Sequence, residues 1–198
     1  MQEKRARLMG VAKANVSNRY AGEEHAVKQA INSYLEIEKV RNQVYERLEE
    51  WYSIYFPEFR ASSPTSLAKF VISFGKNKKE ATVEELRKQI GEGAEKLQRQ
   101  IAESIGREPG DEEYSTIKTM AESELSLLQV ENGIDAYLDA STKRLMPNIT
   151  HLIDYKVAAE LLSKAGSMER LALMPASTIQ LLGAEKALFK HLKYGTKQ

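Results

Sequence analysis

Residues 23–55, EEHAVKQAINSYLEIEKVRNQVYERLEEWYSIY, decide the fold because they contain neither proline nor glycine and carry one unbroken apolar stripe. The stripe advances in steps of three or four residues through Val27, Ile31, Tyr34, Ile37, Val40, Val44, Leu48, Trp51 and Tyr55. This spacing keeps one face of an α-helix apolar. At about 1.5 Å per residue the helix is about 50 Å long. Pro57 ends it, since proline lacks an amide donor and clashes with the preceding turn.

A second long stretch, from Asp111 to about Leu145, has the same character. Its apolar residues are Ile117, Ala121, Leu125, Leu128, Ile134, Leu138 and Leu145, with one irregularity around residues 131–133. Acidic residues at 111–113 and basic residues at 143–144 suit the two ends of a helix dipole. Two long amphipathic helices separated by a compact insert predict an antiparallel coiled-coil hairpin, in which each helix covers the stripe of the other.

The insert, at about residues 57–110, is expected to form short helices. Ser63 and Pro64 predict a capped start for a helix that closes at Gly75. The residues 82–85, TVEE, form a capping-box pattern that opens a helix through Ile90, and a break is expected at residues 91–93. A loop is expected at 107–110, and the lysines at 76, 78 and 79 are interpreted as a solvated basic tip.

After residue 146 the pattern changes to short capped helices. Asn148 is expected to cap a helix over 149–164 that stops at Gly166, and Ser167 to cap a short helix to Met174. Further helices are expected at 176–182 and 184–192, and no segment alternates like a β-strand. The predicted fold is all-α: a coiled-coil domain at 1–146 with a helical insert at its tip, then a small helical module at 147–198.

Composition excludes several classes of protein. The 198 residues include no cysteine, so disulfides, thiolate zinc sites and cysteine nucleophiles are ruled out, and a reducing cytosolic setting fits. No apolar run is long enough for a bilayer, and the first residues lack the apolar core of a secretion signal, so export is not expected.

The net charge of +1 hides a strong segregation. Residues 1–20 carry five Lys and Arg against one acidic residue, and residues 143–198 carry nine against four. The intervening residues 21–142 therefore have a net charge of −8. An acidic body with basic ends is typical of a spacer joined to a polyanion-binding head. Chance variation on solvated helix faces is the alternative.

No catalytic constellation is present, so the chain is predicted not to be an enzyme, and no cofactor is expected. The three histidines, His25, His151 and His191, lie far apart, and none has a histidine or carboxylate at a ligand spacing that recurs elsewhere, so no metal site is expected. Neither a phosphate-binding glycine loop nor a nucleophile elbow occurs. The carboxylates lie on the outer faces of the long helices, where solvation or ion pairing is their ordinary role.

The segment most suggestive of binding is residues 174–193, MPASTIQLLGAEKALFKHLK. Spacings of four and three place Lys186, Lys190 and Lys193 on one side of the last expected helix. Exposed amides at its start, near Gly183, could meet a phosphate. A solvated basic helix is the alternative interpretation.

Residues 175–192, PASTIQLLGAEKALFKHL, closely resemble the signature of the Nop-domain family. That family comprises scaffold proteins of archaeal and nucleolar box C/D ribonucleoproteins and a related spliceosomal pre-mRNA-processing factor. Residues 48–58, LEEWYSIYFPE, resemble the end of the family's first coiled-coil helix. Residues 147–150 and 165–167 resemble parts of its Nop module. Together these motifs cover about residues 20–198 in the family's order.

The resemblance implies a coiled coil through which two copies pair, and a module that binds a kink-turn RNA together with a small ribosomal-protein-like kink-turn binder. The implied contact residues are Gln180, Gly183, Ala184, Glu185, Lys186, Lys190 and His191. Ser177 and Thr178 are expected to shape the turn, and Trp51 and Phe56 to belong to the core.

The sequence also departs from the family pattern. It lacks the family's N-terminal domain, which holds the methyltransferase fibrillarin, and the stretch that follows Gly195. Residues 154–156, Asp-Tyr-Lys, replace the small residues that are usual in the first helix of the module.

The resulting functional hypothesis is a non-enzymatic scaffold for guide-RNA-directed 2′-O-methylation, cytoplasmic in an archaeon or nucleolar in a eukaryote. The alternatives are a splicing-like or ribosome-assembly adaptor on another kink-turn RNA, and a coiled-coil interaction protein without RNA binding.

Overall fold

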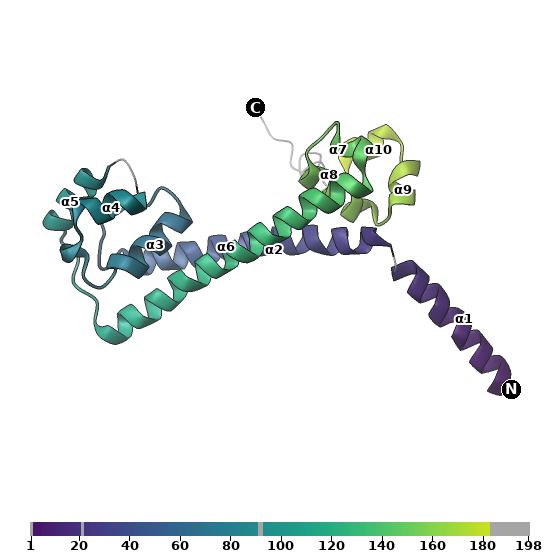
Figure 1. Ribbon diagram of the computed structural model, residues 1–198, viewed down its shortest axis with the longest axis horizontal. Helices are drawn as coiled ribbons and strands as arrows, with labels where there is room; N and C mark the ends of the chain where they lie inside the picture. The colour runs from purple at the N-terminus through teal and green to yellow at the C-terminus, as the bar shows by residue number, and fades with distance from the viewer. Residues whose placement is uncertain (1, 21, 91–92, 183–198) are drawn as a thin grey trace, which may run out of the picture. The chain divides into compact units, whose positions relative to one another are not determined.

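The computed structural model describes residues 2–20, 22–90 and 93–182, and this part of the chain is helical without strands (Figure 1). Its helices are α1 (Gln2–Tyr20), α2 (Glu23–Tyr52), α3 (Pro64–Phe74), the 3₁₀ turn η1 (Lys78–Glu80), α4 (Val83–Ile90), α5 (Ala94–Glu103), α6 (Asp111–Leu145), α7 (Pro147–Thr150), α8 (Tyr155–Ala165), α9 (Met168–Leu173) and α10 (Ala176–Leu181). The chain divides into two compact units: Glu36–Asn132, and Met1–Leu35 together with Gly133–Gln198. The all-α prediction is confirmed, while the division of the sequence at residue 146 stays a prediction.

The two long helices, α2 and α6, pack together and run antiparallel. In the unit 36–132, Leu48 near the end of α2 shares a core with Ile117 near the start of α6. In the other unit, Ile31 near the start of α2 shares a core with Leu138 near the end of α6. Each helix thus covers apolar residues of the other, as the two stripes predicted.

The end of α2 differs from the prediction. The helix ends at Tyr52, and residues 53–55 form a tight turn in which Ile54 N–H donates to the Trp51 carbonyl and Tyr55 N–H to the Tyr52 carbonyl. The sequence 53–55 continues the apolar spacing, but Tyr55 and Phe56 are buried in the tip core instead of extending the stripe.

A buried ion cluster joins α2 to α6 within the unit 36–132. Arg41 Nε and Nη2 donate to Glu124 Oε1 at 3.1 and 2.6 Å, and Nη1 donates to Glu131. Glu124 is fully buried, and the side chain of Arg41 is 13% exposed. Desolvation lowers the pKa of Arg41, but the two carboxylates outweigh it and the net shift is upward. The guanidinium therefore remains charged where the surroundings would otherwise disfavour it.

The insert forms the tip core with the ends of α2 and α6. Ser63 caps α3 in a capping box with Ser66, and Thr82 and Glu85 exchange hydrogen bonds ahead of α4, as predicted. The break before α5 is also confirmed, because Gly93 has a φ of +100°, which side-chain-bearing residues rarely adopt. Phe70 is the centre of this core, with four other aromatic rings within 6.2 Å of its own. The expectation that Phe56 is core is confirmed, and Trp51 packs against the same cluster while partly exposed.

The interpretation of the tip lysines as solvated is wrong for Lys78. Its side chain is 1% exposed, with Nζ 3.6 Å from Glu108 Oε1 and 6.0 Å from the centre of the Phe56 ring. Lys76 pairs with Asp111, and Lys79 Nζ lies 3.8 Å from the same Glu108 carboxylate. Tertiary contacts with the loop before α6, which a local charge run does not reveal, account for the burial.

The start of the module also corrects the prediction. Asn148 does not cap one helix over 149–164, because the chain forms the single turn α7, breaks at 151–154 and restarts as α8. Asp154 is the cap of α8, and its carboxylate accepts from Lys156 N–H at 2.8 Å. The predicted stop at Gly166, which has a φ of +91°, and the Ser167 cap of α9 are both confirmed.

The substitution Arg41→Leu is expected to destabilise the fold by about 3–5 kcal/mol, because it leaves Glu124 buried without its counter-ion. The triple variant Arg41→Leu/Glu124→Leu/Glu131→Gln should recover most of that loss, since none of the three charges remains. Urea unfolding followed by circular dichroism measures both. As a control, Arg47→Leu removes an exposed partner of Glu50 and should cost less than about 1 kcal/mol. Equal losses for Arg41→Leu and Arg47→Leu would contradict the buried ion cluster.

Candidate nucleic-acid interface

Among the sequence-predicted contact residues, the structure describes only Gln180. It lies on α10 and is exposed, and no hydrogen bond or ion pair of its side chain is found within the described ranges. Gly183, Ala184, Glu185, Lys186, Lys190 and His191 lie outside the described residues. Whether these residues come together with Gln180 is therefore untested, and their roles remain proposals.

The chain leading to Gly183 is anchored by apolar packing. Ile179 of α10 and Leu182, the last described residue, pack against a core that includes Ala158 and Leu162 of α8. The same core contains residues of α2 and α6. Ser177 and Thr178 point to the exposed side of α10. The helix preceding the predicted contact segment thus packs against this core while its polar side chains remain accessible.

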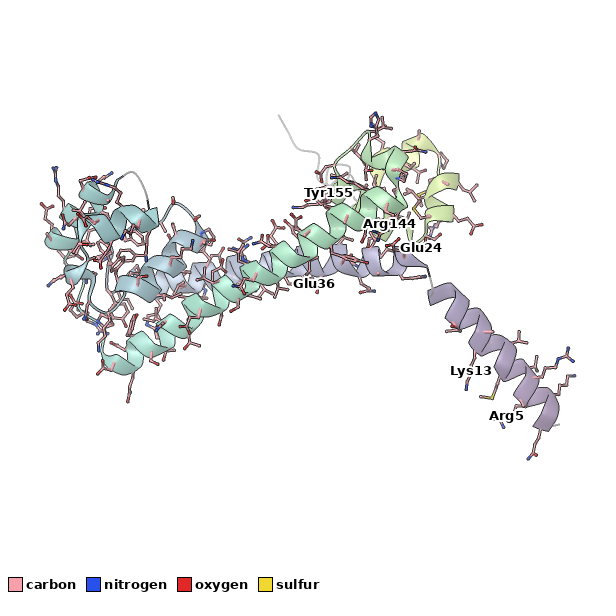
Figure 2. The ribbon with its side chains drawn as sticks, viewed as in Figure 1. Arg5, Lys13, Glu24, Glu36, Arg144 and Tyr155 are labelled. Atoms are coloured by element: carbon pink, nitrogen blue, oxygen red, sulfur yellow. The ribbon has the colours of Figure 1, made fainter. Side chains whose placement is uncertain are left out.

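A charged stripe on α2 contacts the turn between α8 and α9. Lys28 Nζ donates to the Gly166 carbonyl at the end of α8, and Glu24 accepts from Met168 N–H at the start of α9, at 2.9 Å. A cation thus meets the negative end of one helix dipole and an anion meets the positive end of the next. Glu24 is labelled in Figure 2. These contacts fix the α8–α9 turn against α2.

The stripe extends by one further turn of α2. Asn32 accepts from the hydroxyl of Ser163 on α8 at 2.9 Å. Residues 24, 28 and 32 follow at spacings of four, so they share one face of the helix. Sequence reasoning missed this function of α2 because the residues lie off its apolar stripe. The available signal was the regular spacing of these three polar residues along one face of the helix.

The unusual residues 154–156 form a polar cluster between the module and both long helices. Asp135 Oδ1 of α6 accepts from Tyr155 Oη and from Lys156 Nζ, each at 2.8 Å. Lys156 Nζ also donates to Tyr34 Oη of α2 at 2.9 Å and lies 4.4 Å from the centre of the Tyr34 ring. The departure from small residues at 154–156 is thereby explained, because the larger side chains bind the start of α8 to α2 and α6.

The electrostatics of this cluster favour its charged form. The hydrogen bond from Lys156 holds the pKa of the Asp135 carboxyl below its usual range, with a smaller contribution from Tyr155. Desolvation lowers the pKa of Lys156, but its bonds to Asp135 and Tyr34 outweigh this and the net shift is upward. Burial raises the pKa of Tyr155, and the bond to Asp135 raises it further.

An apolar groove lies on the module beside α10. It has a volume of about 440 Å³, and every described residue that lines it is apolar. Ile149 and Leu152 come from the α7 region, Leu161 from α8, Met168 from α9 and Ile179 from α10. Leu152 is 82% exposed, which is a large apolar area to leave in water.

Metal binding and membrane insertion were considered for the residues that the structure describes. They contain no group of three or more His, Asp or Glu side chains that could hold a metal ion. Within the same residues, no helix is both long enough and apolar enough to cross a membrane.

The substitution Asp135→Asn is expected to lower stability at pH 7 by less than about 1 kcal/mol, because the ion pair is partly exposed. The folded-state pKa of Asp135 is depressed, so its contribution is present above the unfolded pKa of about 3.9 and disappears as the pH falls through the folded-state value. Urea unfolding at pH 7, 5, 4 and 3 should show the wild type and variant converging only at the acid end. In a Lys156→Met background the difference should be smaller at every pH. A difference between wild type and Asp135→Asn that does not shrink between pH 7 and pH 3 would contradict the assignment.

Comparisons with known proteins agree with the module's sequence signature. The family model described as "Nop: snoRNA binding domain, fibrillarin" matches residues 33–198. An uncharacterised NOP5 family protein of Methanocaldococcus jannaschii is 38% identical over 175 residues, which cover 85% of this chain and 41% of that protein.

Fungal relatives show a similar degree of identity. Nucleolar protein 58 of Sclerotinia sclerotiorum is 33% identical over 171 residues, covering 84% of this chain and 30% of that protein. Nucleolar protein 58 of Neurospora crassa is 35% identical over 168 residues, covering 83% of this chain and 28% of that protein. The chain thus spans well under half the length of these relatives.

The matched region contains both long helices from residue 33 onward and the entire module, including the contact segment predicted from the sequence. The model of this family is described as a snoRNA-binding domain. The chain belongs to the Nop family.

Proposed function

We propose that this chain is an RNA-bound scaffold of a box C/D ribonucleoprotein, and that its module at 147–198 recognises a kink-turn RNA already bound by a small kink-turn-binding protein. The observation that carries the proposal is the family match over residues 33–198, which includes the basic segment 183–193. The scaffold would support guide-RNA-directed 2′-O-methylation by positioning other components.

The RNA contact is assigned to the segment that follows α10. Lys186 and Lys190 would neutralise phosphates, and the backbone amides near Gly183 and Ala184 would donate to them. Gln180, Glu185 and His191 are the neighbouring polar side chains through which RNA or the partner protein would be contacted. Recognition of this kind depends on RNA shape and the sugar–phosphate backbone.

The protein partner is assigned to the module's apolar groove. Apolar side chains at the centre of a contact and polar ones at its rim are the usual pattern of a protein–protein interface. The groove beside α10 would supply the apolar centre of such a contact, and the exposed polar side of α10 would supply its rim. A composite of RNA and protein would therefore contact adjacent parts of one module.

Self-association is assigned to the middle of the long helices. Within the unit 36–132, Val40 of α2 is 44% exposed and Val130 of α6 is 49% exposed. The described residues of α2 between Ile31 and Leu48 include no fully buried apolar side chain. A second copy that packs there would remove this apolar surface from water.

The contact with fibrillarin is assigned to a domain outside these 198 residues, in keeping with the small share of the relatives' length that the chain spans. The proposed location is the cytoplasm of an archaeon, or the nucleolus if the host is a eukaryote, as the name of the fungal relatives suggests.

Binding to a kink-turn RNA, with and without the small partner protein and at two salt concentrations, tests the proposal. The loaded RNA should bind at least about tenfold more tightly than bare RNA, with affinity falling as salt rises. The variant Lys186→Glu/Lys190→Glu should lose at least about tenfold in affinity and keep its oligomeric state, because each reversed charge removes a phosphate contact. A gel-shift titration with sedimentation of the free protein measures both.

The matched control is Lys69→Glu/Lys88→Glu, which makes the same charge change at exposed lysines of the other unit. It should bind like the wild type. Equal, salt-insensitive binding to any RNA duplex would overturn the proposal. Absence of all RNA binding with intact self-association would instead favour the coiled-coil interaction protein.

A further inference from the structure

Helix α1 forms without burying any of its described side chains. Every side chain that the structure describes between Gln2 and Ser17 is exposed, including Leu8 at 61% and Val11 at 53%. The helix lies outside the family match, which begins at residue 33. Membership of the Nop family therefore assigns α1 no role.

The cations of α1 have no counter-ions among the described residues. Lys4, Arg5, Arg7 and Lys13 take part in no ion pair or side-chain hydrogen bond there. Figure 2 labels Arg5 and Lys13 on this helix. Elsewhere the structure pairs many of its cations, as Arg107 with Glu113 and Arg144 with Glu23 illustrate. Residues 1–20 have a net charge of +4, so α1 is a cationic helix whose described cations are exposed.

The 19 residues of α1 exceed only slightly the length of about 12–15 residues below which isolated helices are marginal in water. Isolated helices need strong helix formers to persist, and α1 contains Gly10 in its interior together with Ser17. The free-energy cost of ordering such a segment is commonly met when it binds a partner. A partner that compensates the four cations, which have no ion pair with any described side chain, would stabilise α1 most.

The arrangement of the cations indicates the kind of partner. At about 100° per residue, Arg5 lies about 100° around the helix from Lys4, and Arg7 about 200° from Arg5. Positive charge thus surrounds the helix instead of occupying one polar face. A membrane-surface helix requires separate apolar and basic faces, whereas phosphates of an RNA can approach a helix from several sides.

We propose that α1 is a second RNA-binding element, which contacts the phosphodiester backbone of the RNA through Lys4, Arg5, Arg7 and Lys13 without reading its sequence. The inference rests on the proposed function, because it assigns α1 to the same RNA that the module binds. Each phosphate contact releases counterions, so α1 contributes to the salt dependence of binding.

The test compares two variants of the whole chain that lose the same charge. The first is Lys4→Gln/Arg5→Gln/Arg7→Gln/Lys13→Gln, in which glutamine preserves helix propensity. The control is Lys39→Gln/Lys69→Gln/Lys88→Gln/Lys96→Gln, which removes four exposed lysines that form no ion pair within the described unit 36–132. Binding to the kink-turn RNA loaded with its partner protein is titrated between 50 and 200 mM salt.

The first variant should reduce the slope of log affinity against log salt by about 3, since each contact contributes about 0.7–0.9. The control should keep the wild-type slope. A second readout is trypsin cleavage within residues 4–13, which RNA should suppress in the wild type. Salt slopes that are equal in the two variants, or cleavage that RNA does not slow, would overturn the role of α1.

Two further outcomes are distinguishable. If the wild type binds RNA and the first variant binds it equally well, only the role proposed for α1 is contradicted. If the wild type does not bind RNA, the proposed function itself is contradicted. If the first variant changes the oligomeric state of the free protein but not its RNA affinity, α1 binds another copy of the chain and the RNA assignment is wrong.

Discussion

The pairing of Arg41 with Glu124 and Glu131 constrains the rest of the unit 36–132. Two carboxylates, one of them fully buried, share a single guanidinium, so a slip of one turn between α2 and α6 would leave Glu124 without its counter-ion. An uncompensated buried charge costs far more than a mismatched apolar contact. Apolar stripes alone would allow α2 and α6 to pack in several registers along their length. The ion cluster favours the one register in which Arg41 lies beside Glu124 and Glu131. The tip core at Leu48 and Ile117 forms in that register.

Helix α2 also determines the placement of the module within its own unit. Its apolar face meets α6, while its polar face holds the α8–α9 turn through Glu24 and Lys28. Lys156 adds a bond from the start of α8 to Tyr34 of α2 and to Asp135 of α6. The module is thus tied to the long helices by charge complementarity at helix ends as well as by apolar packing.

Local signals in the sequence predicted the local structure well. Helix ends at Ser63, Ser167 and Gly166 follow from hydrogen bonds within a few residues and from the backbone freedom of glycine, so the sequence alone suffices. The failures came from contacts between distant residues. Lys78 is buried because Glu108, thirty residues further along, and Phe56 lie beside it.

One error is local. The helix expected over 149–164 is interrupted because Asp154 caps a new helix, α8, and its carboxylate accepts from Lys156 N–H. Helix α1 was expected only as a basic segment, since it has no clear apolar stripe. At the candidate site the sequence identified the family and the basic segment. The sequence did not reveal the hydrogen bonds and ion pairs that position the module. They involve polar residues of α2 and residues 154–156, which are distant from their partners in the sequence and close to them only in the fold.

The central claim is that the basic ends of the chain, and not its acidic helices, contact RNA. Ultraviolet crosslinking of the whole chain to a kink-turn RNA loaded with its partner protein, followed by mass spectrometry of the crosslinked peptides, tests this most directly. Crosslinks should concentrate in residues 176–193 and in α1. Crosslinks confined to α2 and α6 would contradict the account.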